Sequence, residues 1–553
     1  MKLPSKIYRI FAPIGSVVRG TVLAAFLLLM SVFQLSAQDV PYHISNFGVY
    51  DFLDEMANMK VIQINSAIKP FSRLYIATKL QEVQEVSEEL NKRQQKELAF
   101  YLKDFNKELK EDKNFDKRRD LFYYKDSLFR LTINPVLGFD FFSNDSGSVF
   151  HRWGGARVFG NIGKNFGFYW TLIDNYENRS ISTNNFYTQR QGANYKGNGI
   201  EEGDYSEMRG GINYSWKWGR IGVVKDHMVW GNNYNGANIL SGRAPSFAQI
   251  TLNLKPVKWL EFNYFHGWLV SVVVDSARSY YSGASDRLVM HQKFIASNMV
   301  SVTPTKNLVV SGGNSIVYSD ELNPVYFIPF MFYKSVDHTY NNTGSNFIGQ
   351  NAQMFLDISS RQIRKLHLYS TIFVDELALS RMFDKDQQTN FYSLKLGGRV
   401  NNFLVQNLAL TAEFTRTNPG VYEHGVITTT FASNEYSMGH YLQDNSKDVY
   451  LAMSYRPVAK LLIRASYNQA EVGESFPITA AHGTSAFGLP YLESALWRSY
   501  TSTIKFQYQV YNDGYATLGY SIRAVSGPEA PLNTPAFYLG NTNTLSFGLN
   551  FGF

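Results

Sequence analysis

Hydrophobic and polar residues alternate along most of the chain after about residue 127. At the carboxyl end, five apolar residues fall on one face of a predicted strand: Leu545, Phe547, Leu549, Phe551 and Phe553. Small and polar residues fall on the other face, because successive side chains of a strand point to opposite sides. A strand with one Phe-rich face and one small, polar face is typical of a transmembrane β-barrel, which has lipid outside and water in its lumen.

The same alternation recurs upstream and is clearest over residues 500–510. Clusters of Gly, Pro, Asn and Asp, which favour tight turns, separate such strands at residues 163–165, 219–220, 255–258, 303–307, 361–365, 401–402, 456–460 and 512–514. Between one tight turn and the next lies a longer polar and aromatic segment, such as residues 175–207, 230–247 or 320–349. Short turns on one side and long loops on the other are typical of an outer-membrane barrel.

The turns also predict the number of strands. Eight tight turns join sixteen strands, and one strand before and one after them give about eighteen, with both termini on the short-turn side. The sequence therefore predicts a closed antiparallel outer-membrane β-barrel of about 18 strands over residues 127–553, with both termini periplasmic. A soluble propeller or solenoid would need a fixed repeat, whereas the turn spacings scatter widely.

Residues 38–126 have a helical period instead. Leu98, Tyr101, Leu102, Phe105 and Leu109 form one stripe of an amphipathic helix, and Asn91 with Gln94 are spaced as a capping box. Shorter helices are predicted around Tyr50, Leu53 and Ala57 and after a cap at Ser72. We therefore expect a smaller N-terminal α-helical periplasmic domain over residues 38–126.

Residues 1–37 have the pattern of a secretory signal peptide: a basic leader, an apolar run over residues 22–32 and a small-residue cleavage site at residues 35–37. The sequence contains no cysteine, which excludes disulfides and lipoprotein acylation. Aromatic residues make up 15% of the chain, as the interfacial girdles of a barrel require. The net charge of +7 is too small and too diffuse to indicate a nucleic-acid partner.

Several phrases in the middle of the chain resemble one family. Residues 230–241 read WGNNYNGANILS and are followed by Ala244-Pro245-Ser246-Phe247 and, later, by Leu322-Asn323-Pro324-Val325-Tyr326-Phe327. Together with the order of signal, helical domain and barrel, these phrases resemble the Wzi-type capsule assembly outer-membrane proteins. The resemblance implies a lectin-like protein that binds capsular polysaccharide or exopolysaccharide and helps to attach or organise it at the cell surface.

Sugar binding requires aromatic faces, planar amides and, for acidic polymers, cations. Two predicted loops supply such residues, and we expect a polysaccharide-binding surface made of Trp230, Asn232, Tyr234, Asn235, Arg243, Tyr326, Tyr333, Lys334, His338 and Tyr340. Phe551 and Phe553 are expected to serve as the signal read by the barrel assembly machinery. Outer-membrane lipid and lipopolysaccharide are expected neighbours, and peptidoglycan or the export apparatus are candidate partners of the helical domain.

Two other functions stay open. One is a porin or diffusion channel, against which a helical domain and inward-folding aromatic loops argue. The other is an outer-membrane enzyme acting on glycan or lipid. The sequence has no nucleophile elbow, P-loop, dinucleotide fingerprint or HExxH motif, so we predict no catalytic residues, no metal and no cofactor.

Overall fold

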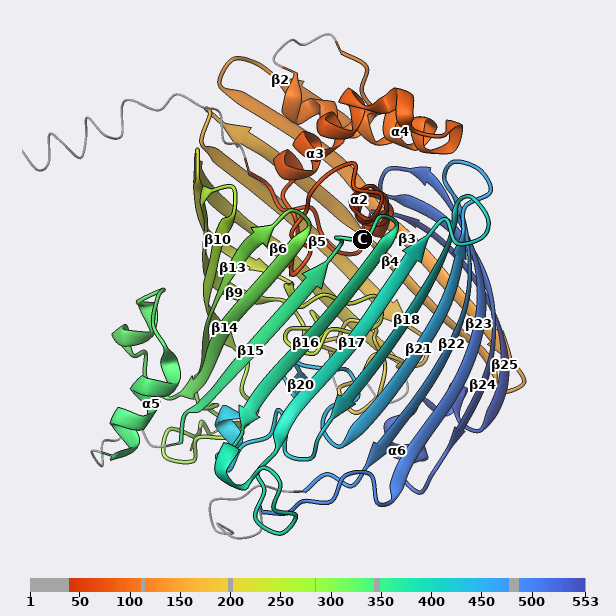
Figure 1. Ribbon diagram of the computed structural model, residues 1–553. Coiled ribbons are helices and arrows are strands. Elements are labelled where there is room, and N and C mark those ends of the chain that lie inside the picture. Colours follow the sequence, from red (N-terminus) through yellow and green to blue (C-terminus); the bar gives the residue numbers. More distant parts are fainter. Residues whose placement is uncertain are drawn as a thin grey trace, which may run out of the picture.

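The computed structural model describes residues 39–110, 115–196, 202–283, 285–342, 349–476 and 487–552. The predicted signal peptide, residues 1–37, and the terminal Phe553 lie outside the described residues. Within them, the carboxyl-terminal part of the chain forms a closed barrel of antiparallel strands (Figure 1). None of the helices in the described ranges is long and apolar enough to cross a membrane.

Nineteen strands share the barrel sheet in the described residues; eighteen close the ring, and β2 (Phe122–Lys125) pairs with β3 alone. The ring strands are β3 (Phe129–Asn144), β4 (Gly147–Ile162), β5 (Phe166–Glu177), β6 (Gly203–Trp216), β7 (Gly219–Asp226), β9 (Phe247–Val257), β10 (Leu260–Leu269), β13 (Lys293–Thr305), β14 (Leu308–Ser319), β15 (Asn351–Ser360), β16 (Leu366–Glu376), β17 (Phe391–Asn401), β18 (Leu408–Thr417), β21 (Ser446–Tyr455), β22 (Leu461–Gly473), β23 (Ala495–Tyr511), β24 (Gly514–Ser526) and β25 (Asn541–Phe551). The predicted fold class and strand number are confirmed.

The last strand closes the ring as its pattern predicts. β25 pairs with β24 on one side and with β3 on the other, from Leu545 opposite Ser143 to Phe551 opposite Leu137. The side chains of Leu545, Phe547 and Leu549 are 53%, 42% and 49% exposed on the outer face, whereas Thr542 and Thr544 are buried on the inner face. The outer wall is therefore apolar where a soluble protein would be polar.

All eight predicted tight turns connect strands at one end of the barrel, which we call the helical end because α2, α3 and α4 lie there (Figure 1). The long connections lie at the opposite end, the loop end. One hairpin at the loop end is also tight, at Asn144–Gly147 between β3 and β4. It leaves the predicted strand number unchanged, because β3 is the strand that precedes the first predicted pair.

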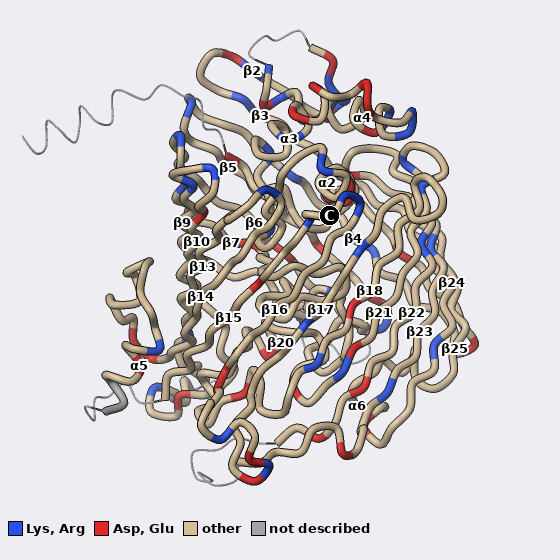
Figure 2. Tube along the Cα trace, in the orientation of Figure 1, with Lys and Arg blue, Asp and Glu red and all other residues tan. Residues whose placement is uncertain are grey.

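The helices form where the period changes, and the predicted caps are present. At the start of α4 (Lys92–Leu109), the Asn91 side chain accepts a hydrogen bond from the Gln94 backbone N–H, and the Gln94 side chain accepts one from the Asn91 backbone N–H. At the start of α3 (Arg73–Glu85), the Ser72 side chain accepts a hydrogen bond from the Tyr75 backbone N–H. α2 (Phe47–Asn58) packs with them around a core that includes Leu53, Leu80 and Phe105. Figure 2 shows acidic and basic residues intermixed along α4. The acidic ones are buried in ion pairs, and the exposed charged residues of the helix are Lys92, Lys96 and Lys103.

Ion pairs hold α2 inside the mouth of the barrel. Asp51 and Asp54 lie one turn apart on this helix and face four arginines of the inner wall and its turns. The shortest N–O distances are 2.8 Å from Arg361 to Asp54, 3.0 Å from Arg456 to Asp51, 3.3 Å from Arg464 to Asp51 and 3.7 Å from Arg399 to both carboxylates. Burial opposes ionisation, but the neighbouring guanidinium groups outweigh it and lower the pKa of both carboxyl groups.

Two loops from the loop end fold back into the lumen. The first lumen loop (residues 227–246) and the second lumen loop (residues 418–445) supply Trp230, Leu240 and Phe431 to a buried cluster that also contains the inward-facing wall residues Phe265 and Phe355. β8 (Val229–Trp230) of the first lumen loop pairs with β1 (Ile68–Lys69), which lies between α2 and α3. The β1–β8 pairing therefore joins the helical segment to the first lumen loop inside the barrel.

Phe547→Arg tests the lipid-facing assignment of the wall. A charge on the lipid side of a barrel costs about 2–4 kcal/mol at mid-membrane and about 0–1 kcal/mol near the interface. We expect Phe547→Arg to lower the free energy of unfolding by about 2–4 kcal/mol, measured by urea titration in lipid vesicles. Asn543→Arg, on the same face of β25 but nearer the loop end, is the matched control with a smaller effect. Equal losses would contradict the assignment.

Asp54→Ala tests the ion pairs of α2. Breaking a buried ion pair leaves uncompensated charge and costs about 3–5 kcal/mol, so we expect a loss of that size together with faster amide hydrogen exchange over residues 47–58. The control is Glu82→Ala, which removes the exposed partner of Lys79 at 2.8 Å and should cost less than about 1 kcal/mol. Unchanged exchange in α2 after Asp54→Ala would show that the ion pairs do not hold the helix.

Candidate functional site

The predicted binding residues of the first lumen loop lie inside the protein rather than on a surface. Trp230, Asn232, Asn235 and Arg243 are 1%, 2%, 7% and 3% exposed. The indole of Trp230 packs edge-on against Phe265 and Phe355 of the inner wall, with ring centroids 5.3 and 5.9 Å apart. The expectation of an exposed surface here is wrong, because the apolar residues of this loop fill the lumen instead of standing in solvent.

The polar residues of this loop have structural partners. The backbone N–H and Nδ2 of Asn232 donate to the two carboxylate oxygens of Asp357 at 2.8 and 2.6 Å. Asn235 donates to Asp448 at 2.9 Å, and Arg243 donates to the backbone oxygens of residues 184 and 186 at 3.1 and 2.6 Å. These bonds fix the loop within the lumen.

Tyr234 differs, because it is half-buried and lines a cavity of about 300 Å³ beside α2. Its hydroxyl donates to Asp54 at 2.8 Å and lies 2.9 Å from Nδ1 of His367. Burial, reinforced by the Asp54 carboxylate, raises the pKa of Tyr234 well above its usual value, so the hydroxyl is a hydrogen-bond donor and not a phenolate.

The second predicted group lies on the other side of the barrel wall. Tyr326 and Tyr333 are fully buried against outward-facing residues of β10, β13 and β14. Lys334 is half-buried and His338 exposed on α5 (Tyr333–Asn342), and Tyr340 belongs to the same helix although its side chain lies outside the description. The ten predicted residues therefore do not form one surface; whether any of them binds polysaccharide stays a prediction.

A second lumen cavity has the composition that sugar binding requires. It measures about 450 Å³ and is bounded by the chain before α2, by residues 182–192 of the loop after β5, and by the inner faces of β3–β6 and β23–β25. We call it the lumen cavity. Its lining includes Trp153, Tyr205, Tyr515, Asn175, Gln191, Asn550, Asp140, Glu207, Arg190, Arg209 and Lys505. Pockets of roughly 300–1,000 Å³ hold small ligands in other proteins.

The accessible charged groups of the lumen cavity include two cations. Lys505 faces inward from β23 and is exposed to the cavity. Arg190 reaches in from the loop of residues 178–202, with its guanidinium 3.4 Å from Glu177 and 3.2 Å from Nδ1 of His151. The indole of Trp153 lies beside the His151 ring at 4.7 Å. Aromatic rings, amides and cations are together the groups that bind a hydroxylated, acidic chain.

The sequence reasoning missed these residues because they meet only in three dimensions. Trp153 and Lys505 lie on opposite sides of the closing pair β25–β3, more than three hundred positions apart in the chain. The available signal was weak: Lys505 is a cation on the polar face of a clearly alternating strand, and such a residue points into the lumen of a barrel.

One buried group has the composition of a metal site. His43, Asp226 and His227 bring two imidazole nitrogens and a carboxylate together, and Nε2 of His43 lies 3.2 Å from Nδ1 of His227. Both Asp226 oxygens already accept hydrogen bonds, from Tyr169 and from the His227 backbone. Burial and the nearby Arg209 guanidinium lower the pKa of both imidazoles, that of His227 to about 3. The two imidazoles are therefore neutral, and the cluster is already hydrogen-bonded without an ion.

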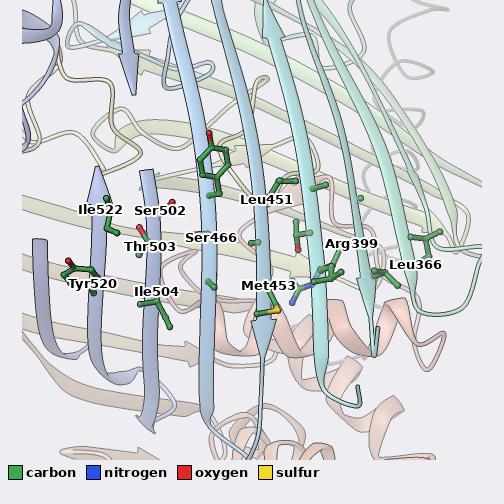
Figure 3. A pocket seen from close by; sticks show the side chains of 18 residues that line it. Leu366, Arg399, Leu451, Met453, Ser466, Ser502, Thr503, Ile504, Tyr520 and Ile522 are labelled. Atoms are coloured by element: carbon green, nitrogen blue, oxygen red, sulfur yellow. The ribbon is translucent and has the colours of Figure 1, made fainter. Parts of the chain in front are cut away.

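The outer wall carries an apolar hollow of about 800 Å³ over β16–β18 and β21–β24 (Figure 3). Gly398, Ala412 and Ala465 are small, and the larger Leu451, Met453, Ile504 and Ile522 stand around them. The hollow lies on the lipid-facing side of the wall, where acyl chains can fill it. It is not a candidate site for a polar ligand.

No family model matches the chain, and no curated protein matches it. Among solved structures, it is similar to Wzi of Escherichia coli, described as an outer-membrane protein involved in group 1 capsule assembly and a carbohydrate-binding β-barrel. The TM-score is 0.56 with 11% identity, over 94% of this chain and 100% of that chain.

Two porin-like structures match less well. Acinetobacter baumannii OccAB2 has a TM-score of 0.42 and 9% identity over 76% of this chain and 97% of that chain. Pseudomonas aeruginosa OprD has a TM-score of 0.41 and 9% identity over 76% and 94%. The resemblance to Wzi-type proteins that the sequence motifs indicate is thus confirmed in the fold: this chain is an outer-membrane-type β-barrel built like Wzi.

Proposed function

We propose that this protein binds a surface polysaccharide in the lumen of an outer-membrane barrel, without catalytic turnover, and so helps to hold or organise that polymer at the cell surface. The observation that carries the proposal is the lumen cavity, where aromatic faces, amides and the cations Arg190 and Lys505 line about 450 Å³. The similarity to a barrel described as carbohydrate-binding supports it.

The filling of the lumen favours a binding protein over a diffusion channel. Ion pairs hold α2 in the mouth of the barrel, and both lumen loops contribute to a hydrophobic cluster inside it. A channel conducts through a water-filled lumen, whereas a packed lumen can present a ligand to fixed side chains. Single-channel recording in planar bilayers separates the two functions, because a large and steady conductance would support the porin.

The orientation is part of the proposal. The helical end would face the periplasm with both termini, as the short turns imply, and the loop end would face the exterior, where the polysaccharide and lipopolysaccharide lie. The barrel assembly machinery would insert the chain through its aromatic last strand. Peptidoglycan or the export apparatus would then meet α3 and α4.

Lys505→Ala tests the cavity. A hydrogen bond to a charged group contributes about 1.5–3 kcal/mol, so removing this cation should weaken binding of an acidic polysaccharide by roughly 10–100-fold. The measurement is titration calorimetry with purified protein in detergent. Lys164→Ala is the control, because it removes the same charge from an exposed turn at the helical end and should leave the affinity unchanged. Equal effects of the two variants, or no binding by the wild type, would refute the proposal.

A further inference from the structure

Part of the outer wall is polar, although it faces the side where lipid is expected. On β13 and β14 the cross-strand pairs Phe294–Tyr318, Ala296–Ile316, Asn298–Asn314 and Val300–Gly312 share one face. Val300 is 40% exposed on that face, whereas Ile295, Met299 and Val317 on the opposite face pack in the lumen. Asn298 and Asn314 therefore point outward, as Tyr264 and His266 do on the neighbouring strand β10.

A segment from the loop end covers this polar region. Residues 322–332, which we call the outer flap, leave β14 at the loop end and fold back along the outside of β10, β13 and β14 (Figure 1 shows the adjoining α5 outside the barrel). Phe330 stacks on outward-facing Phe262 with ring centroids 4.1 Å apart, and Phe327 stacks on His266 at 4.1 Å. Beneath the flap, Phe294, Ile316 and Tyr318 are at most 2% exposed.

The outward-facing polar residues bond to three carbonyl oxygens of the outer flap and to one N–H just after it. Nδ2 of Asn298 donates to the carbonyl oxygens of Pro329 and Met331 at 2.9 and 2.8 Å, and the Tyr264 hydroxyl donates to the Tyr326 carbonyl at 2.8 Å. Just after the flap, the Tyr333 N–H donates to Asn314 at 2.8 Å. Pro324 and Pro329 have no N–H to satisfy.

This pattern supplies part of what irregular backbone needs at membrane depth, namely partners for three of the flap carbonyl groups. Hydrocarbon offers no hydrogen bonds, so non-helical backbone is tolerated there only where protein groups satisfy it. An Asn on the lipid side of a barrel wall would itself be costly. The wall amides donate to the flap carbonyls, which lowers the cost of the irregular backbone. The flap in turn covers the wall amides, which lowers the cost of placing Asn on the lipid side.

The free face of the outer flap is apolar. Leu322, Phe327, Ile328, Phe330 and Phe332 are 47%, 37%, 47%, 69% and 51% exposed, and the flap contains no charged residue. Polar residues return immediately afterwards, with Lys334 and the exposed His338 on α5. An apolar segment followed by a polar helix matches the change from hydrocarbon to headgroups at a membrane surface.

The outer flap reaches deep along the wall. Phe330 stacks on Phe262, whose cross-strand partner is the exposed Val300. Val300 lies seven residues below the loop-end residue of β13, Lys293, which is about 23 Å of strand at about 3.3 Å per residue. Asn314 pairs with Met354 of β15, which is 40% exposed. The flap is thus continuous with the lipid-facing band of the barrel.

We propose that the outer flap is embedded in the membrane leaflet at the loop end, where Phe327, Ile328, Phe330 and Phe332 contact lipid acyl chains. The flap is then a lipid-contacting extension of the wall and not a solvent-exposed loop. This inference does not depend on polysaccharide binding.

The chain has no cysteine, so single-cysteine labelling tests the proposal cleanly. We would attach a bimane fluorophore to Phe330→Cys, to Leu356→Cys as the lipid-facing reference and to Ser146→Cys at the exposed hairpin tip as the aqueous reference, in phosphatidylcholine vesicles. Brominated acyl chains should quench the Phe330→Cys label at least half as strongly as the Leu356→Cys label, whereas iodide should quench only the Ser146→Cys label.

Quenching of the Phe330→Cys label by iodide and not by brominated lipid would overturn the proposal, since the flap would stand in water. Quenching by neither would also overturn it, since a protein partner would then cover the flap. Adding Asn298→Leu and Asn314→Leu should at least halve the lipid quenching, because the Pro329 and Met331 carbonyls lose their donors. The control Asn543→Leu, on another outward face near the loop end, should leave the lipid quenching unchanged. Heat-modifiable gel mobility reports that each variant is folded.

Discussion

Two carboxylates on one turn of α2 are held by four guanidinium groups of the barrel interior, and the arrangement of the lumen depends on these contacts. An unpaired arginine or aspartate that is buried in the lumen is destabilising, because its charge loses the solvation of water. Asp51 and Asp54 remove both costs at one place on the wall, at distances of 2.8–3.7 Å. This fixes the position of the helix, and the space left beside it becomes the cavity lined by Tyr234 and, farther round the ring, the lumen cavity.

Polar groups on the outside of the wall are also paired, but with different partners. Inside, arginines of the wall pair with carboxylates of α2, whereas outside Asn298 and Tyr264 donate to backbone carbonyls of the outer flap. At both of these places, polar groups of the barrel wall contact another segment of the chain. Leu549 and Leu356 illustrate the apolar band of the outer face, which suits lipid because lipid offers no hydrogen bonds.

The local sequence pattern predicts most of the fold. Alternation identifies strands, turn residues place eight of the connections at one end, and the Asn91–Gln94 spacing predicts the start of α4, because each of these features depends on neighbouring residues. The candidate site is different. Trp230 and Tyr326 lie in similar aromatic loops, yet one fills the lumen and the other covers the outer wall. That choice depends on distant partners, Phe265 for one and Tyr264 for the other, which composition cannot reveal.

The barrel is closed by the pairing of its first strand, β3, with its last strand, β25. Because the ring is continuous, α2 and both lumen loops are enclosed on every side by hydrogen-bonded strands. With the seam intact, these segments can leave the interior only through the two ends of the barrel.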